Sequence, residues 1–273
     1  MGGSQRLRKA AVIVLGLVWL APIYLMLVNA AKPEDTYVDS SAWVPADISG
    51  LWDNINTAWT RGHLSESFSA TAVYSVTAPA LSVLIGAAAG YAIVALRLRA
   101  GFLWLVVIFT SSVFPLQMLL MPLFTGYVDF DLYDTRLGMI LIYTVVSVAF
   151  TSFVMRNFFS GIARQTFEAA IVDGASTWRI FWRIYLPMST PALVALFILQ
   201  ATSVWNDLLL GLTLTRSEEV RPLMASLAAL QGNYGGATMP VLLAGGLIVS
   251  IPTVLLFLFT QRFFARGLSL GQF

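Results

Sequence analysis

The sequence predicts an all-α membrane protein with six transmembrane helices. Of the 273 residues, 58% are hydrophobic and only 11% are charged, and the mean hydropathy is +0.79. A soluble domain carries about 25% charged residues, because its surface has to be wetted. Apolar stretches recur along the chain at about 20 residues, the length that a helix needs to cross the hydrocarbon core of a bilayer.

The six spans are taken in order from windows that contain no charged residue. The last such window, residues 222–261, holds a stretch rich in Gly, Asn and Tyr at 231–236, so the sixth helix is placed after it. The windows lack the alternation of barrel strands, and their prolines are compatible with helices whose neighbours satisfy the freed backbone groups. One membrane domain, residues 1–273, is therefore predicted, with spans at about 10–31, 69–96, 102–124, 137–157, 189–211 and 239–261.

The first span has two interpretations. Arg6, Arg8 and Lys9 precede it, and Val28-Asn29-Ala30 resembles a cleavage site, as in a signal peptide. Its 22 apolar residues, 10–31, exceed the usual signal-peptide core of about 7–15 residues. We expect an uncleaved membrane anchor.

The loop charges predict that both the N- and the C-terminus are cytoplasmic. With that orientation eleven Lys and Arg residues lie on the inner side and five on the outer side, in agreement with the positive-inside rule. Two connections are long, an acidic outer segment at 32–66 and an inner connection at 158–188.

The second predicted span carries a stripe of small residues. Ser82, Gly86 and Gly90 recur at intervals of four, a spacing that lets another helix approach closely. A structural role in helix packing is predicted for them.

The inner connection contains a pattern that predicts a docking element. Residues 167–174 read Phe-Glu-Ala-Ala-Ile-Val-Asp-Gly, and nine residues later the chain reads Ile-Tyr-Leu-Pro at 184–187. Apolar positions at i, i+3 and i+4 share one helical face, small alanines permit close approach, and Asp173-Gly174 predict the end of a helix. Taken alone, the segment would also fit an ordinary interfacial helical hairpin.

This pattern resembles the signature of binding-protein-dependent ABC importer permeases, which is Glu-Ala-Ala, three residues, Gly, nine residues, Ile-x-Leu-Pro. The resemblance extends over nearly the whole chain and is strongest to the maltose-type, carbohydrate-importing branch. Lys32-Pro33-Glu34, Leu132-Tyr133-Asp134-Thr135 and Trp205-Asn206-Asp207 are similar to that branch. The chain departs from it at Gly271-Gln272-Phe273, where members often end in a small residue followed by Lys-Gly, so the sequence leaves open whether the tail reaches the ATPase pair.

The resemblance implies a translocation subunit in a bacterial or archaeal plasma membrane, without catalytic activity of its own. It implies a second homologous permease, two ATPase subunits that hold ATP and Mg, an external substrate-binding protein and a sugar or sugar derivative as cargo. Closure of the ATPase pair would turn the helices through cytoplasmic coupling helices between spans four and five, giving alternating access. The residues implied in docking the ATPase are Phe167, Glu168, Ala169, Ala170, Asp173, Gly174, Ile184, Leu186 and Pro187.

Polar residues inside the spans are candidates for the translocation path. Asp207 is the clear charge within a span, and such charges are costly and usually functional. Gln200, Ser203 and Asn206 recur with it on the fifth span, and Gln117 lies between two prolines on the third. Polar packing between helices, or a kink with a satisfied amide, explains these residues equally well.

The sequence also argues against other classes of protein. No Gly-x-x-x-x-Gly-Lys-Ser/Thr motif occurs, the chain has no cysteine and one histidine, and basic residues do not cluster with aromatics. We therefore expect no catalytic residue, metal site or nucleic-acid partner, and lipid as the surrounding medium. A solute-coupled secondary transporter is the alternative function, although neither inverted repeats nor midplane carboxylates are evident.

Overall fold

The structure is a computed structural model, and it describes residues 2–45, 47–231 and 236–269. Within these residues it is all helical and contains no strand. The chain divides into two compact units, Met1–Ser65 with Ser226–Pro252 (unit 1) and Glu66–Ala225 with Thr253–Phe273 (unit 2). The C-terminal residues at which the sequence departs from the permease pattern, 271–273, lie outside the described residues.

Among the residues that the structure describes, four helices are long and apolar enough to cross a membrane, and two bent helix pairs raise the number of candidate spans to as many as six. The bent pairs are α5 (Gly101–Val113) with α6 (Leu116–Asp129), at 91°, and Thr177–Met188 with α11 (Thr190–Trp205), at 75°. An all-helical chain with four to six spans is thereby confirmed. The four long helices are α1 (Gly2–Ala30), α4 (Leu64–Val94), α7 (Arg136–Ser160) and α14 (Met239–Ser269).

In the structure, the segment expected as a span at 102–124 is the bent pair of α5 and α6. The chain turns between α5 and α6 at Phe114, which is extended with φ −64° and ψ 130°. Pro115 follows, and a residue before proline is pushed out of the helical region by the proline ring. Pro115 thus lies at the bend between the two helices, whereas Pro122 lies within α6.

The fifth span also ends earlier than predicted. The expected helix covers 189–211, but α11 ends at Trp205 and a short helix, α12 (Leu209–Leu214), follows after a break. The carboxylate of Asp207 accepts a hydrogen bond from the backbone N–H of Gly211 (3.1 Å), so it caps the start of α12.

In unit 1 the chain folds back on the C-terminal end of α1 through α2 (Glu34–Tyr37) and α3 (Gly50–Arg61). Lys32 is fully buried, and its Nζ donates to Asn29 Oδ1 (3.0 Å) and to the carbonyl of Ser41 (2.7 Å). Asn54 of α3 donates to the carbonyls of Ala30 and Lys32 at 2.9 and 2.8 Å. Asn54 thereby satisfies the carbonyl of Ala30, one of those that the end of α1 leaves without an intrahelical partner.

In unit 2, α4 and α7 pack closely and run in the same direction. A Cβ at Gly86 would lie 2.5 Å from Thr151 Oγ1, and a Cβ at Gly90 would lie 2.7 Å from the backbone N of Arg156. Thr151 also donates to the carbonyl of Ser82 (2.9 Å). The predicted role of the small-residue stripe in helix packing is confirmed, and the residue numbers of the two helices rise together along the contact.

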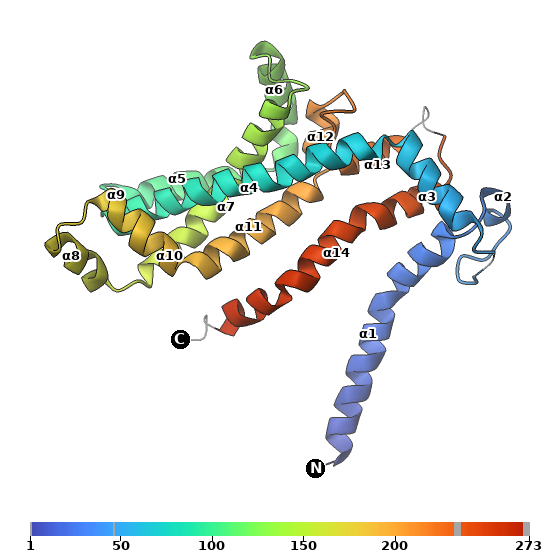
Figure 1. Ribbon diagram of the computed structural model, residues 1–273, viewed down its shortest axis with the longest axis horizontal. Helices are drawn as coiled ribbons and strands as arrows, with labels where there is room; N and C mark the ends of the chain where they lie inside the picture. The colour runs from blue at the N-terminus through green and yellow to red at the C-terminus, as the bar shows by residue number, and fades with distance from the viewer. Residues whose placement is uncertain (1, 46, 232–235, 270–273) are drawn as a thin grey trace. The chain divides into compact units, whose positions relative to one another are not determined.

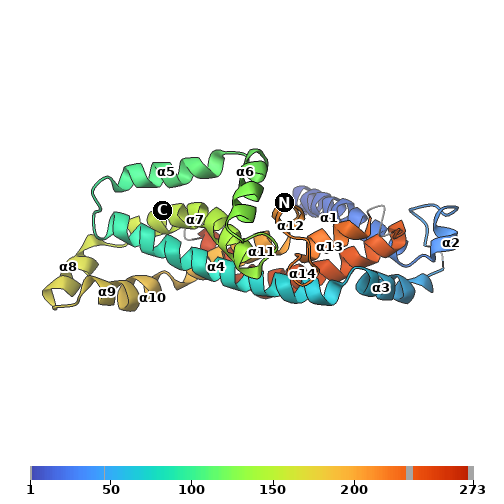
Figure 2. The ribbon, with the colours of Figure 1, turned by 90° about the horizontal axis from the view of Figure 1, so that it is seen from above.

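Two core clusters lie at opposite ends of this helix pair. The first, around Tyr91, Phe159 and Tyr185, joins the C-terminal ends of α4 and α7 to residues 162–197. The second, around Tyr74, Tyr127 and Tyr143, joins the N-terminal ends of α4 and α7 to α6 and α12. In Figures 1 and 2, α8 and α9 lie at one end of α4, and α6 and α12 lie toward the other.

Two further parts of unit 2, the α5–α6 pair and α11, each run once between these two ends of the α4–α7 pair. Gly101, at the start of α5, faces Ile93 of α4, whereas Tyr127 of α6 belongs to the second cluster. Helix α11 runs from Leu196 in the first cluster to Val204 in the second. This arrangement supports one membrane crossing for each bent pair, and in the second pair α11 alone makes that crossing.

Candidate functional site

The segment between α7 and α11 folds into a helical hairpin at one end of unit 2 (Figure 1). It comprises α8 (Arg164–Val172), α9 (Thr177–Ile180), a π-helical turn (Phe181–Tyr185) and α10 (Leu186–Met188). Helix α8 ends where the Asp-Gly pair predicts, and Gly174 turns the chain with φ +77°. Such a left-handed conformation favours glycine, because a side chain would crowd the backbone.

Tyr91 of α4 holds the hairpin from inside. Its hydroxyl donates to the carbonyl of Thr177 (2.8 Å). Its ring centroid lies 5.1 Å from that of Phe181, 4.9 Å from Tyr185 and 6.5 Å from Phe167. One residue thus joins both helices of the hairpin to a long membrane helix.

Arg164 makes a second connection between α8 and α4. Its Nη1 donates to the carbonyl of Ala95 (2.7 Å), at the end of α4, and its guanidinium lies 4.6 Å from the ring centroid of Phe167. Its Nε donates to Glu168 Oε1 (3.0 Å), a largely exposed pair worth about 0.3–0.5 kcal/mol. Sequence reasoning missed both Arg164 and Tyr91, although the i,i+4 spacing of Arg164 and Glu168 was a usable signal.

The residues expected to dock a partner fall into two groups. Phe167 and Ala170 are each 7% exposed and pack in the first core cluster, with Ile184 and Leu186 half-buried against it. The apolar face of Phe167 and Ala170 is covered by the chain itself, and their part in docking a partner stays a prediction. The remaining five residues of the set, Glu168, Ala169, Asp173, Gly174 and Pro187, are exposed.

An exposed edge of α8 therefore remains, which we define as Glu168, Ala169, Ile171, Val172 and Asp173. Ile171 is 44% exposed and Val172 is 87% exposed. This edge combines two carboxylates with aliphatic side chains, and it is held from behind by Phe167 and Ala170.

The candidate path residues differ in exposure and in their hydrogen bonds. Asp207 accepts a hydrogen bond from the hydroxyl of buried Tyr143 (2.9 Å). Gln200 is buried, whereas Ser203 and Asn206 are exposed, and Asn206 donates to Thr202 of its own helix (2.8 Å). Gln117 is exposed on α6. The carboxylate of Asp207 is thus engaged in packing α7, α11 and α12.

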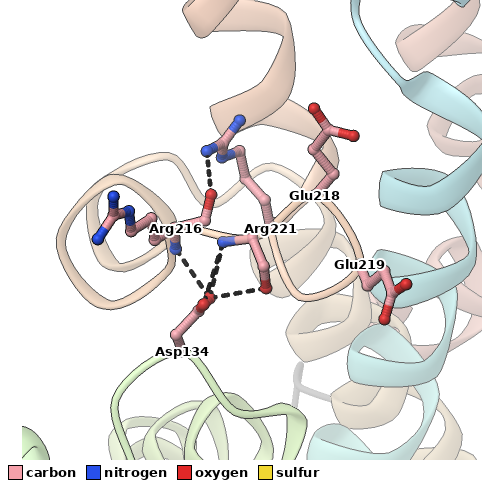
Figure 3. Close-up of a pocket in the computed structure, with 6 residues that line it drawn as sticks. Asp134, Arg216, Glu218, Glu219 and Arg221 are labelled. Atoms are coloured by element: carbon pink, nitrogen blue, oxygen red, sulfur yellow. Dashed lines mark hydrogen bonds between the residues drawn. The ribbon is translucent and has the colours of Figure 1, made fainter.

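At the opposite end of unit 2, Asp134 fixes the loop after α12 (Figure 3). Its Oδ1 accepts from the backbone N–H groups of Arg216 (2.8 Å) and Ser217 (2.9 Å), and Arg136 Nη2 donates to the carbonyl of Glu219 (3.2 Å). A shallow pocket at this place is lined by Asp134, Arg216, Ser217, Glu218, Glu219 and Arg221. Among the residues that the structure describes, no three His, Asp or Glu side chains converge as a metal-binding group.

Comparison with known proteins agrees with this arrangement. "Probable ABC transporter permease protein YurM" of Bacillus subtilis (strain 168) is 31% identical over 257 residues, which cover 92% of this chain and 82% of that protein. "Diacetylchitobiose uptake system permease protein NgcG" of Streptomyces coelicolor is 28% identical, covering 97% and 87%.

A solved structure of a bacterial ABC transporter involved in the import of the acidic polysaccharide alginate contains a chain that is similar throughout. It superposes with a TM-score of 0.75 at 25% identity, covering 97% of this chain and 99% of that one. Residues 82–269, which include the hairpin and the whole first core cluster, match the family described as "Binding-protein-dependent transport system inner membrane component". The parallel helix pair, the braced hairpin and these similarities together show that the chain belongs to that family of multi-pass membrane permeases.

Proposed function

We propose that the chain is the translocation subunit of an ATP-driven importer, and that the exposed edge of α8 docks a separate ATPase subunit. The single observation that carries this proposal is the contrast between the two faces of α8. One face is held against α4 by the ring contact of Tyr91 with Phe167 and by the hydrogen bond of Arg164 to Ala95, while the other presents Val172 at 87% exposure. A rigid, exposed element joined to a membrane helix is suited to pass a movement of the ATPase subunit on to that helix.

Saccharides are the proposed cargo. The relative NgcG is named for diacetylchitobiose uptake, and the similar solved structure is named for alginate import. The family is described as binding-protein-dependent, which supports an external substrate-binding protein as the donor of the cargo. The proposed assembly contains a second homologous permease and two ATPase copies that hold ATP and Mg, in a bacterial or archaeal plasma membrane.

The family favours this function over a solute-coupled secondary transporter. The two differ in their energy source, which is measurable in proteoliposomes that contain the whole complex. Uptake should require ATP together with the liganded binding protein, and an imposed ion gradient should not replace ATP. Uptake driven by the gradient alone would contradict the proposal.

The docking surface is tested with Val172→Arg in the intact complex. The change places a charge in an exposed aliphatic position, so the ATPase subunit should no longer co-purify with the permease and uptake should fall at least tenfold. Val38→Arg is the matched control, because Val38 is 84% exposed on the outer segment. Co-purification of the ATPase should persist with that variant.

Both variants should reach the membrane in normal amounts, since neither position is buried. If Val172→Arg retains the ATPase and imports at the normal rate, the exposed edge of α8 is not the docking surface.

A further inference from the structure

The second half of the hairpin presents a different surface from the first. In Thr177–Met188, which we call the interfacial helix, Ile180, Phe181 and Tyr185 are buried in the first core cluster. Trp178 and Trp182 are 68% and 42% exposed, and their ring centroids lie 5.5 Å apart. The backbone N–H of Leu186 donates to the carbonyl of Phe181, the i+5 pattern of a π-helix, which often marks functional positions.

The charges of this surface are all positive. Arg179 and Arg183 are exposed, and neither has an ion-pair partner among the residues that the structure describes. The interfacial helix contains no acidic residue, whereas the exposed edge of α8 carries Glu168 and Asp173. The interfacial helix is thus suited to a negatively charged partner, whereas the exposed edge of α8 is suited to a positively charged one.

The direction of the interfacial helix places this surface at the membrane boundary. It meets α11 at 75°, so when α11 crosses the bilayer the interfacial helix lies close to the membrane plane. Helices that lie in this plane bury Trp at the level of the headgroups and turn Lys and Arg toward anionic lipids. The cytoplasmic leaflet carries the negative surface potential that such cations meet.

We propose that the interfacial helix binds anionic phospholipid headgroups of the inner leaflet through Arg179 and Arg183, with Trp178 and Trp182 inserted beside them. This inference rests on the proposed function only for the side of the membrane. It assigns lipid, and not the ATPase, to the Trp-Arg surface of the hairpin. The docking edge and the lipid surface are then neighbours on one rigid element.

The test uses the intact complex in nanodiscs of phosphatidylcholine with or without phosphatidylglycerol. Native mass spectrometry counts the phosphatidylglycerol retained in competition with phosphatidylcholine. The double variant Arg179→Gln/Arg183→Gln should lower this preference about 25-fold, because each cation near an anionic surface contributes about a factor of five. Arg61→Gln, an exposed arginine of unit 1, is the matched control and should leave it unchanged.

Two further measurements keep the outcomes distinct. Arg179→Lys/Arg183→Lys keeps both charges, so it should retain the lipid preference if charge and not folding is responsible. Brominated phosphatidylglycerol should quench tryptophan fluorescence less in Trp178→Phe/Trp182→Phe than in the unmodified complex.

An unchanged lipid preference in the glutamine variant would overturn the proposal. Loss of the ATPase subunit from that variant, with lipid retention intact, would assign the surface to the ATPase instead and would also overturn it. The proposed import function is judged separately, by ATP-dependent uptake, and stands or falls without the lipid result.

Discussion

Gly174 is the residue at which the docking hairpin reverses direction. Its φ is +77°, and an added Cβ would meet nothing within 4 Å. The requirement for glycine is therefore one of backbone conformation alone. A side chain in the left-handed region costs about 1–2 kcal/mol, least for Asn and most for a β-branched residue.

Gly174→Val should therefore disturb the turn, while Gly174→Asn should be tolerated. We expect Val at this position to lower ATP-dependent uptake severalfold with normal membrane insertion, because α8 would no longer meet the ATPase at the same angle. Uptake into proteoliposomes is the measurement. Equal rates for the two variants would show that the left-handed turn is not needed for coupling.

Among the helices, the pair α4 and α7 depends on the absence of side chains at Gly86 and Gly90. A Cβ at Gly86 would lie 2.5 Å from Thr151 Oγ1, closer than real Cβ contacts allow. Gly126 of α6 offers a matched comparison, because nothing lies within 4 Å of its Cβ position. The position of Gly86 and Gly90 in the contact between α4 and α7, and not the glycine content of a helix as such, determines how close the two helices come.

Gly86→Ala should lower the free energy of unfolding in detergent by about 1–3 kcal/mol, as overpacked cores do. Gly126→Ala should be neutral or slightly stabilising, because alanine favours the helix by up to about 1 kcal/mol. Thermal unfolding of the two variants side by side provides the measurement. A Gly86→Ala protein as stable as the unmodified chain would mean that α4 and α7 can separate at no cost.

The predicted helices and the observed ones differ where tertiary contacts act. Charge-free windows located α4, α7 and α14 because length and hydropathy alone decide whether a helix can span a bilayer. They did not predict the turn at Phe114, since the same Pro signal is tolerated at Pro122 inside α6. The end of α11 was missed because Asp207 was expected within a helix, not as the cap of α12.

The candidate site shows the same limit. The spacing of Phe167 and Ala170 correctly predicts one apolar face on α8, but periodicity does not say whether that face is covered by the chain or by a partner. Tyr91 covers it from α4, a residue distant in sequence and without any pattern that marks it. The residue types on the exposed edge of α8 could be predicted from the sequence, and the contact with Tyr91 that holds α8 against α4 could not.

At the scale of the whole molecule, the orientation in the membrane remains a prediction, and the chain is suited to test it. It contains no cysteine, so a single engineered thiol reports the side on which it lies. Val38, in the segment after α1, and Ser160, at the end of α7, are both exposed. A membrane-impermeant maleimide should label Val38→Cys in intact cells and Ser160→Cys only in inverted vesicles.

Both variants should label fully after detergent is added, which controls for thiol reactivity. The reverse pattern would place the hairpin on the outer side, where no cytoplasmic ATPase could reach it.

The parallel course of α4 and α7 has a mechanical consequence. Each helix contributes to both aromatic clusters, and the seam around Gly86 leaves no gap between them. From Tyr91 to Tyr74 the helical rise is about 25 Å, most of the thickness of the hydrocarbon core. Two helices packed in this way move as one rigid body. A tilt imposed at the Tyr91 end therefore also displaces the end near Asp134.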